Sequence, residues 1–151
     1  MTRITEKFWE DCRYFLKGET WGDWTKISKE LIDALIRLRQ LANRSVNIHC
    51  AWASGVGHSS KSMHYTDPCL AADVHITGMT ILEQVKLAHS AGFNAIGAYP
   101  FWNKPGIHVD LRGLLGKPDI FWIEAEKGKE GTYTYYKTFE EFCEALKQIK
   151  I

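Results

Sequence analysis

The chain has 151 residues, of which 45% are hydrophobic and 25% are charged, a composition typical of globular proteins. Nineteen Lys and Arg residues against 18 Asp and Glu give a formal charge of +1, which argues against a strongly basic nucleic-acid surface. No apolar run approaches the roughly 20 residues that cross a membrane, and charged residues occupy the start, where a secretion signal would be apolar. We therefore expect a single domain over residues 1–151, a monomer made in the cytoplasm without a signal peptide, membrane span or nucleic-acid partner.

Apolar residues recur at helical spacing in four stretches. The first covers residues 5–16, and the second begins after the N-cap candidate Ser28 and continues to about Ala42. The third covers residues 80–91, and the fourth begins after Thr138. The third and fourth each open with a threonine followed three positions later by a glutamate, the pattern of a capping box.

Alternating or apolar runs predict strands at residues 46–52, 70–76, 107–111, 121–125 and 132–136, with a further short apolar stretch at 95–99. The two strands nearest the C-terminus flank a charged turn that contains glycine, which predicts a hairpin. Helices and strands do not alternate regularly along the chain. This order favours the α+β class over a doubly wound parallel sheet.

Three potential metal ligands fall in separate segments of this pattern. His64 ends a loop rich in Gly and Ser, Asp73 lies inside one predicted strand, and His108 lies inside another. The HExxH and paired CxxC patterns of other zinc sites are missing. Two imidazoles and one carboxylate, with a fourth position left to water, are the composition of a catalytic zinc site. From spacing alone, the alternative is a structural domain without zinc.

Four short motifs follow one another along the chain: Ser62-Met63-His64, Ala71-Ala72-Asp73-Val74, Gly97-Ala98-Tyr99-Pro100 and Gly106-Ile107-His108-Val109-Asp110-Leu111-Arg112. Their order and spacing resemble the zinc D-Ala-D-Ala carboxypeptidase-like family of peptidoglycan peptidases, which is related in fold to lysostaphin and the hedgehog signalling domain. The resemblance covers residues 46–112. It implies a small antiparallel sheet packed by helices, and Zn²⁺ held by His64, Asp73 and His108, with Ser62 supporting the loop.

Two features depart from the family pattern. Asp73 follows His64 by nine residues where the family has seven, so Asp67-Pro68 looks like a two-residue insertion. Many members carry an arginine before this loop that is thought to hold a substrate carboxylate. Here Lys61 is the nearby cation.

The proton-transferring group is not given by the resemblance, because Pro105 and Gly106 stand where relatives place an acid or a histidine. Asp110 is our candidate general base, since residues two apart on a strand share a face and Asp110 follows His108 at that interval. The alternative is that Asp110 pairs with Arg112 or orients a ligand. His75 stands in the same relation to Asp73, as a base or an orienting group, and Tyr99 is a candidate oxyanion donor.

The sequence thus predicts a zinc metallopeptidase that cuts an amide bond in peptidoglycan stem peptides or cross-links. Without an export signal, it resembles a phage or prophage lysis enzyme that reaches the cell wall after release. The alternative is a zinc-binding module of the same fold that has lost hydrolysis and acts as a wall-binding or structural module.

Overall fold

The computed structural model describes residues 1–53, 61–127, 129 and 132–149. Its helices and strands follow the order α1 (Glu6–Asp11), α2 (Lys29–Ala42), β1 (Val46–Cys50), β2 (Ala71–Ile76), α3 (Ile81–Ser90), β3 (Ala95–Tyr99), β4 (Gly106–Asp110), β5 (Ile120–Glu124), β6 (Tyr133–Tyr136) and α4 (Phe139–Lys147). Short 3₁₀ turns lie at η1 (Trp24–Lys26), η2 (Met63–Tyr65) and η3 (Arg112–Leu115). The α+β class is confirmed.

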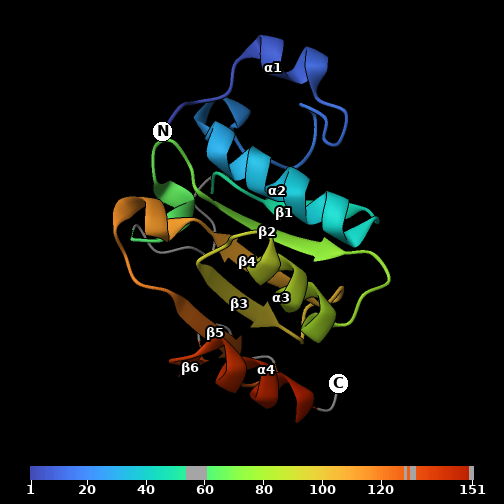
Figure 1. The fold of residues 1–151 in the computed structure, drawn as a ribbon, viewed down its shortest axis with the longest axis vertical. Helices are drawn as coiled ribbons and strands as arrows, with labels where there is room; N and C mark the ends of the chain where they lie inside the picture. Colours follow the sequence, from blue (N-terminus) through green and yellow to red (C-terminus); the bar gives the residue numbers. More distant parts are fainter. Residues whose placement is uncertain (54–60, 128, 130–131, 150–151) are drawn as a thin grey trace.

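The strands form one sheet in the order β1-β2-β4-β3-β5-β6 (Figure 1). Four of the five neighbouring pairs are antiparallel, including the expected hairpin of β5 and β6, but β3 and β5 run parallel. The sheet is therefore mixed, and the expectation of an antiparallel sheet is wrong. The reason lies in the segment between β4 and β5, which carries the chain past β3 through η3 before it turns back, so that β5 enters in the direction of β3.

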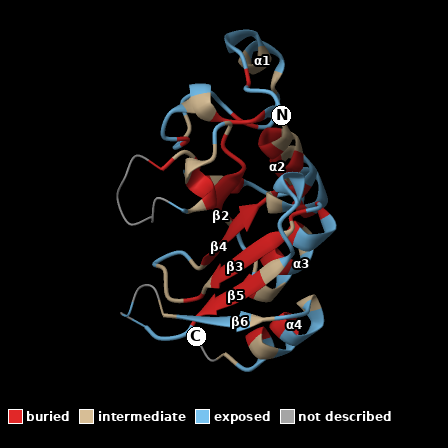
Figure 2. Cartoon of the chain, turned by 90° about the vertical axis from the view of Figure 1, so that its left-hand side faces the viewer, coloured by how far each residue is buried: buried red, intermediate tan, exposed pale blue. Residues whose placement is uncertain are grey.

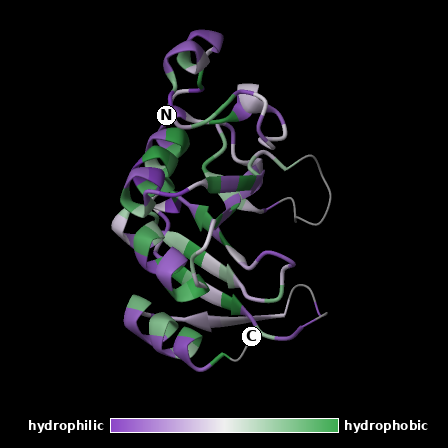
Figure 3. Ribbon diagram, turned by 90° about the vertical axis from the view of Figure 1, so that its right-hand side faces the viewer, coloured by the Kyte–Doolittle hydropathy of each residue, from purple (hydrophilic) through white to green (hydrophobic). Residues whose placement is uncertain are grey.

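Helices α2, α3 and α4 cover one face of the sheet, whereas η2 and loops lie on the other (Figures 1 and 2). Ile107 and Val109 of β4 are fully buried in the hydrophobic core. Because side chains alternate along a strand, His108 and Asp110 lie on the opposite face. We call this second surface the open face. In Figure 3, hydrophobic and hydrophilic residues are interspersed along the helices, and apolar residues such as Leu31 and Leu35 of α2 are buried.

The predicted helix starts are confirmed by hydrogen bonds. Ser28 Oγ accepts from Leu31 N at 3.1 Å, and Thr138 Oγ1 accepts from Glu141 N at 3.1 Å. The capping box of α3 is complete: Thr80 Oγ1 accepts from the Glu83 amide at 3.2 Å, and a Glu83 carboxylate oxygen accepts from the Thr80 amide at 2.9 Å. Each cap satisfies amide groups that the helix itself leaves without a partner.

The first helix is shorter than predicted. It ends at Asp11 rather than at residue 16, and Cys12 has an extended backbone. Leaving the helix here allows Phe15 to reach the core, where its ring packs edge-to-face against Trp21 at 5.7 Å. Burial of an aromatic side chain outweighs the few backbone bonds that a longer helix would add.

A short N-terminal strap, residues 3–4 and 26–28, holds the segment that follows His64. The amide of Ser28 donates to the carbonyl of Cys69 at 3.1 Å, and the amide of Cys69 donates to the carbonyl of Lys26 at 2.7 Å. The side chain of Asp67 accepts from Arg3 and lies 3.9 Å from Lys26 Nζ. Asp67 therefore attaches this loop to the start of the chain. Among the described residues, no helix has both the length and the apolar character required to cross a bilayer.

Candidate metal centre

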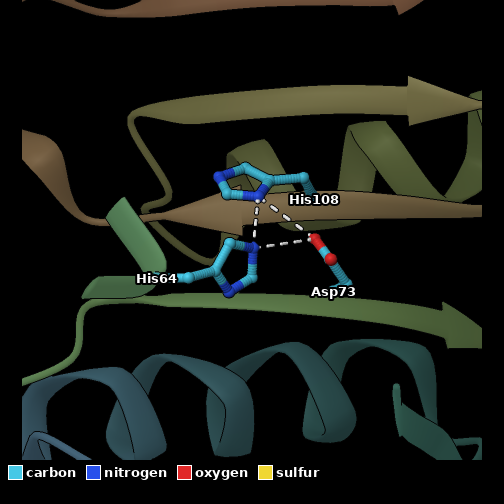
Figure 4. Close-up of side chains that lie close together, drawn as sticks. All are labelled: His64, Asp73 and His108. Carbon is cyan, nitrogen blue, oxygen red and sulfur yellow. Dashed lines mark hydrogen bonds and ion pairs between the residues drawn. The ribbon is translucent and has the colours of Figure 1, made fainter. Parts of the chain in front are cut away.

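Three separate elements bring His64, Asp73 and His108 together (Figure 4). His64 lies in η2, where Ser62 Oγ accepts from its amide at 3.2 Å, as expected for a residue that supports the loop. Asp73 on β2 pairs with His108 on β4 across an antiparallel ladder. Directly opposed residues project from the same face of a sheet. All three side chains are buried.

One atom from each of these side chains forms a nearly equilateral triangle. His64 Nε2 lies 3.2 Å from Asp73 Oδ1 and 3.1 Å from His108 Nδ1, and the latter two atoms are 3.1 Å apart. A tetrahedral ion with bonds of about 2.0–2.1 Å holds its ligand atoms about 3.3 Å from one another. The three atoms therefore have the spacing of three corners of a tetrahedral zinc site.

The hydrogen bonds of the other nitrogen in each ring determine the tautomer of the two histidines, and so which nitrogen presents a lone pair to the triangle. His64 Nδ1 lies 2.6 Å from the carbonyl oxygen of Ala51, and His108 Nε2 lies 2.8 Å from a carboxylate oxygen of Asp110. A carbonyl or ionised carboxylate oxygen only accepts, so we assign the ring hydrogens to Nδ1 of His64 and Nε2 of His108. In the neutral rings, two nitrogen lone pairs and the Asp73 oxygen then converge on one point. Such a cluster is stabilised by a cation.

The pKa values of both histidines reflect the same electrostatics. Burial lowers the pKa of His64, but hydrogen bonds with Asp73 and Cys50 outweigh it and raise that pKa to about 9. Burial also lowers the pKa of His108, whereas hydrogen bonds with Asp110 and Asp73 raise it to about 9. Without a metal ion, protonation of the histidines would supply the positive charge that the cluster favours.

Asp110 is fully buried behind His108 rather than exposed beside the triangle. Its Oδ1 accepts from Arg112 N at 3.0 Å and Nε at 2.9 Å, and its Oδ2 accepts from Arg112 Nη2 at 2.6 Å as well as from His108. Burial raises the pKa of Asp110, but the bonds from Arg112 and His108 lower it to about 2. This geometry favours the orienting role, because a carboxylate on the outer nitrogen of a ligand histidine fixes its ring and tautomer.

His75 lies on the same strand as Asp73 and pairs with His49 of β1. Its Nδ1 is 2.6 Å from His49 Nε2, and burial lowers the pKa of both rings. No pattern in the sequence indicated a pairing of His49 with His75. The antiparallel pairing of β1 with β2, which places the two rings on one face, was the missing information. Of the other histidines, His89 is exposed on α3 and stacks on Phe139, and His58 lies outside the described residues.

Tyr99 lines the same pocket as His64 and His108. Its hydroxyl oxygen accepts from Trp122 Nε1 at 3.2 Å, and its ring stacks on Trp102 with the centroids 4.4 Å apart. Burial raises the pKa of this phenol well above its ordinary value. Tyr99 is therefore a neutral hydroxyl at physiological pH, held in the pocket wall by two tryptophans.

The pocket beside the triangle has a volume of ≈ 370 Å³. Its wall combines cationic and aromatic side chains, namely Lys61, Arg112, Lys117, Tyr99, Trp122, Tyr133 and Tyr135. We call it the basic-aromatic pocket. Sequence reasoning did not identify Trp122 or Lys117 as part of the site. The glycine at position 97 was a signal, since a Cβ there would lie 2.3 Å from the Trp122 ring, which rests on the sheet beside His108.

Comparison with protein-family models and with curated proteins finds no match for this chain. The assignment of the site therefore depends on its chemistry and geometry.

Proposed function

We propose that the protein is a zinc-dependent peptidase, with a fold like that of hedgehog and the D-Ala-D-Ala peptidases, that hydrolyses an amide bond in peptidoglycan stem peptides or cross-links. The observation that carries the proposal is the convergence of His64 Nε2, Asp73 Oδ1 and His108 Nδ1 at mutual distances of 3.1–3.2 Å. Two neutral nitrogens and one carboxylate oxygen suit Zn²⁺ and leave a fourth coordination position for water or substrate.

A bound zinc ion would supply Lewis-acid activation of water and of the amide carbonyl. The chain's own residues prepare that position. The carbonyl of Ala51 and the carboxylate of Asp110 hold the two rings in the tautomers that present lone pairs. Arg112 keeps Asp110 ionised. The basic-aromatic pocket, which opens beside both rings, receives the substrate.

A specific observation favours the second candidate, a zinc-binding module of this fold without hydrolytic activity. Both carboxylate oxygens of Asp110 are already engaged by Arg112 and His108, and the Nδ1 of His75 is engaged by His49. Asp110 is therefore not poised to accept a proton in the arrangement that the structure describes, and one of the two ring nitrogens of His75 is occupied. Under this alternative, the protein binds zinc and the cell wall but cuts nothing.

The test uses purified cell walls and the full-length protein with one equivalent of zinc. A peptidase lowers the turbidity of the wall suspension and releases amino groups, and His108→Ala lowers that rate at least 100-fold because one zinc ligand is lost. Chelation does the same, and added zinc restores the rate. His89→Ala, which removes a histidine from the helix-covered side, is the matched control and retains activity.

Two results would decide against the peptidase. Turbidity loss that survives both chelation and His108→Ala would show that the cluster is not involved. Stoichiometric zinc together with sedimentation on walls, but with no released amino groups, would identify the non-hydrolytic module.

A further inference from the structure

Two pockets flank the metal centre on the open face of the sheet. The basic-aromatic pocket extends from His64 and His108 over β3, β5 and β6. A second pocket, of ≈ 390 Å³, lies over β1, β2 and the turn between β3 and β4, and is lined by His49, Asp73, Trp102, Asn103 and Lys104. We call it the histidine-tryptophan pocket. Asp73 borders it, so the three ligands stand between the two hollows.

The two pockets differ in chemistry. Of the described residues that line the basic-aromatic pocket, Lys61, Arg112 and Lys117 are cationic and none is acidic. Arg112 is already paired with buried Asp110. Lys117, in the exposed segment between η3 and β5, therefore contributes positive charge that suits an anionic group on a substrate.

The histidine-tryptophan pocket offers a flat aromatic surface beside the imidazole of His49, with the charged groups of Asp73 and Lys104 also in its wall. Trp102 stacks on Tyr99, and its ring centroid lies 5.7 Å from that of His49. Tyr99 thus contacts Trp102 of one pocket and bonds to Trp122 of the other. The aromatic surface continues from one hollow to the other, past the metal centre. A peptide backbone and uncharged side chains are suited to such a surface.

An enzyme that removes a terminal residue must stop the chain on one side of the reacting bond. The described residues form a hollow on both sides of the three ligands instead. Building on the proposed function, we propose that the substrate peptide lies across the metal centre with residues in both pockets, that the bond cut is internal, and that Lys117 binds an anionic group on the substrate. Hydrolysis adds one water across the C–N bond and leaves a carboxylate on one fragment and an amine on the other.

The first test is the mass of the products from purified peptidoglycan digested by the zinc-loaded protein. After an internal cut, neither product is a single free amino acid. Release of single free amino acids alone would overturn this inference and leave the proposed peptidase intact. No product at all, with zinc bound, would instead be a failure of the proposed function.

The second test compares Lys117→Ala with Lys86→Ala, which removes the same charge from α3 on the other side of the sheet. The substrates are soluble wall fragments with their carboxylates either free or converted to amides. We expect Lys117→Ala to raise KM about fivefold to tenfold on the free carboxylates and less than about twofold on the amides. Lys86→Ala should change neither. Equal effects of Lys117→Ala on both substrates, or none on either, would refute the anionic contact.

The other pocket is tested by Trp102→Ala and Lys104→Ala on the same fragments. Loss of the flat Trp102 surface should raise KM about fivefold or more for fragments that extend on both sides of the cut, while zinc stoichiometry stays unchanged. Lys104→Ala keeps the aromatic surface and should raise KM less than Trp102→Ala does. If neither variant alters KM, the peptide does not occupy this pocket.

Discussion

The two faces of the sheet are built from alternate residues of the same strands. One face forms the hydrophobic core, and the other carries the candidate site. On β4, Ile107 and Val109 face the helices in the core, whereas His108 lies in the candidate metal centre and Asp110 pairs with His108 and Arg112. On β5, Phe121 packs against Phe142 of α4. The neighbouring Trp122 lines the basic-aromatic pocket.

The two faces contribute to the stability of the fold in different ways. Apolar side chains on the helix-covered face stabilise it by leaving water, at about 1.5–3 kcal/mol for each large one. Buried polar groups on the open face stabilise it only when every one is bonded, so Asp110 requires Arg112, and His64 requires the carbonyl of Ala51. Substitutions on the two faces should therefore separate fold stability from metal affinity.

The largest expected effect is on the helix-covered face. Ile107→Ala should lower the free energy of unfolding by about 2–5 kcal/mol, because it leaves a cavity in the core. Zinc stoichiometry of the folded protein should not change. Denaturant unfolding of the chelated protein measures the first quantity, and metal analysis measures the second. His108→Ala is the companion variant, expected to abolish zinc binding at a smaller cost to the metal-free fold. If Ile107→Ala also loses zinc, the two faces are not separable.

The next effect concerns the support of the metal ligands. Asp110→Asn removes the negative charge behind His108 while keeping the side-chain shape, and should weaken zinc binding about 10–100-fold. Competition with a chromogenic chelator measures the dissociation constant. Asp33→Asn, at an exposed ion pair on α2, is a control that should leave it unchanged. Unaltered affinity in Asp110→Asn would remove its orienting role.

In the chelated protein, low pH should remove about 2 kcal/mol of the contribution that Asp110 makes to the free energy of unfolding. The pKa of Asp110 is about 2 in the fold against its usual 3.8, so its ionised form stabilises the fold above about pH 4. That contribution disappears as the pH falls from about 4 to about 2. The difference in unfolding free energy between wild type and Asp110→Asn should shrink by about 2 kcal/mol between pH 5 and pH 2. A difference independent of pH would contradict this assignment.

The smallest effect lies in the strap that holds the loop of His64. Arg3 and Asp67 form an exposed ion pair, so a double-mutant cycle of Arg3→Ala and Asp67→Asn should give a coupling energy of about 0.2–1 kcal/mol. Thermal unfolding of the four proteins provides the measurement. A coupling energy of zero would mean that Asp67 does not stabilise the loop through Arg3.

Much of the fold could be predicted because its signals are local. Capping residues such as Thr80 and the alternation of residues 107–111 depend on near neighbours, and the structure confirms both. The order of the strands and the parallel pair β3-β5 depend on how distant segments meet, which no local pattern contains. The predicted end of the first helix was wrong for the same reason, because the packing of Phe15 on Trp21 determines where the helix ends.

The candidate site also has features that the sequence predicted and features that it did not. The three candidate ligands were predicted as a set, and the structure places their donor atoms together. The residues that hydrogen-bond to these ligands could be predicted from the sequence only in part. Asp110 shares the face of His108 as expected, and its pairing with Arg112 was one of the roles that the sequence left open. The burial that places bonds on both of its oxygens could not be predicted from the sequence. The pairing of His49 with His75 required the register of β1 on β2.

Crystals grown with zinc and measured at the zinc absorption edge would test the metal centre most directly. We predict one strong anomalous peak within bonding distance, about 2.0–2.2 Å, of His64 Nε2, Asp73 Oδ1 and His108 Nδ1. The absence of a peak there, or a single peak at the pair of His49 and His75, would contradict the assignment.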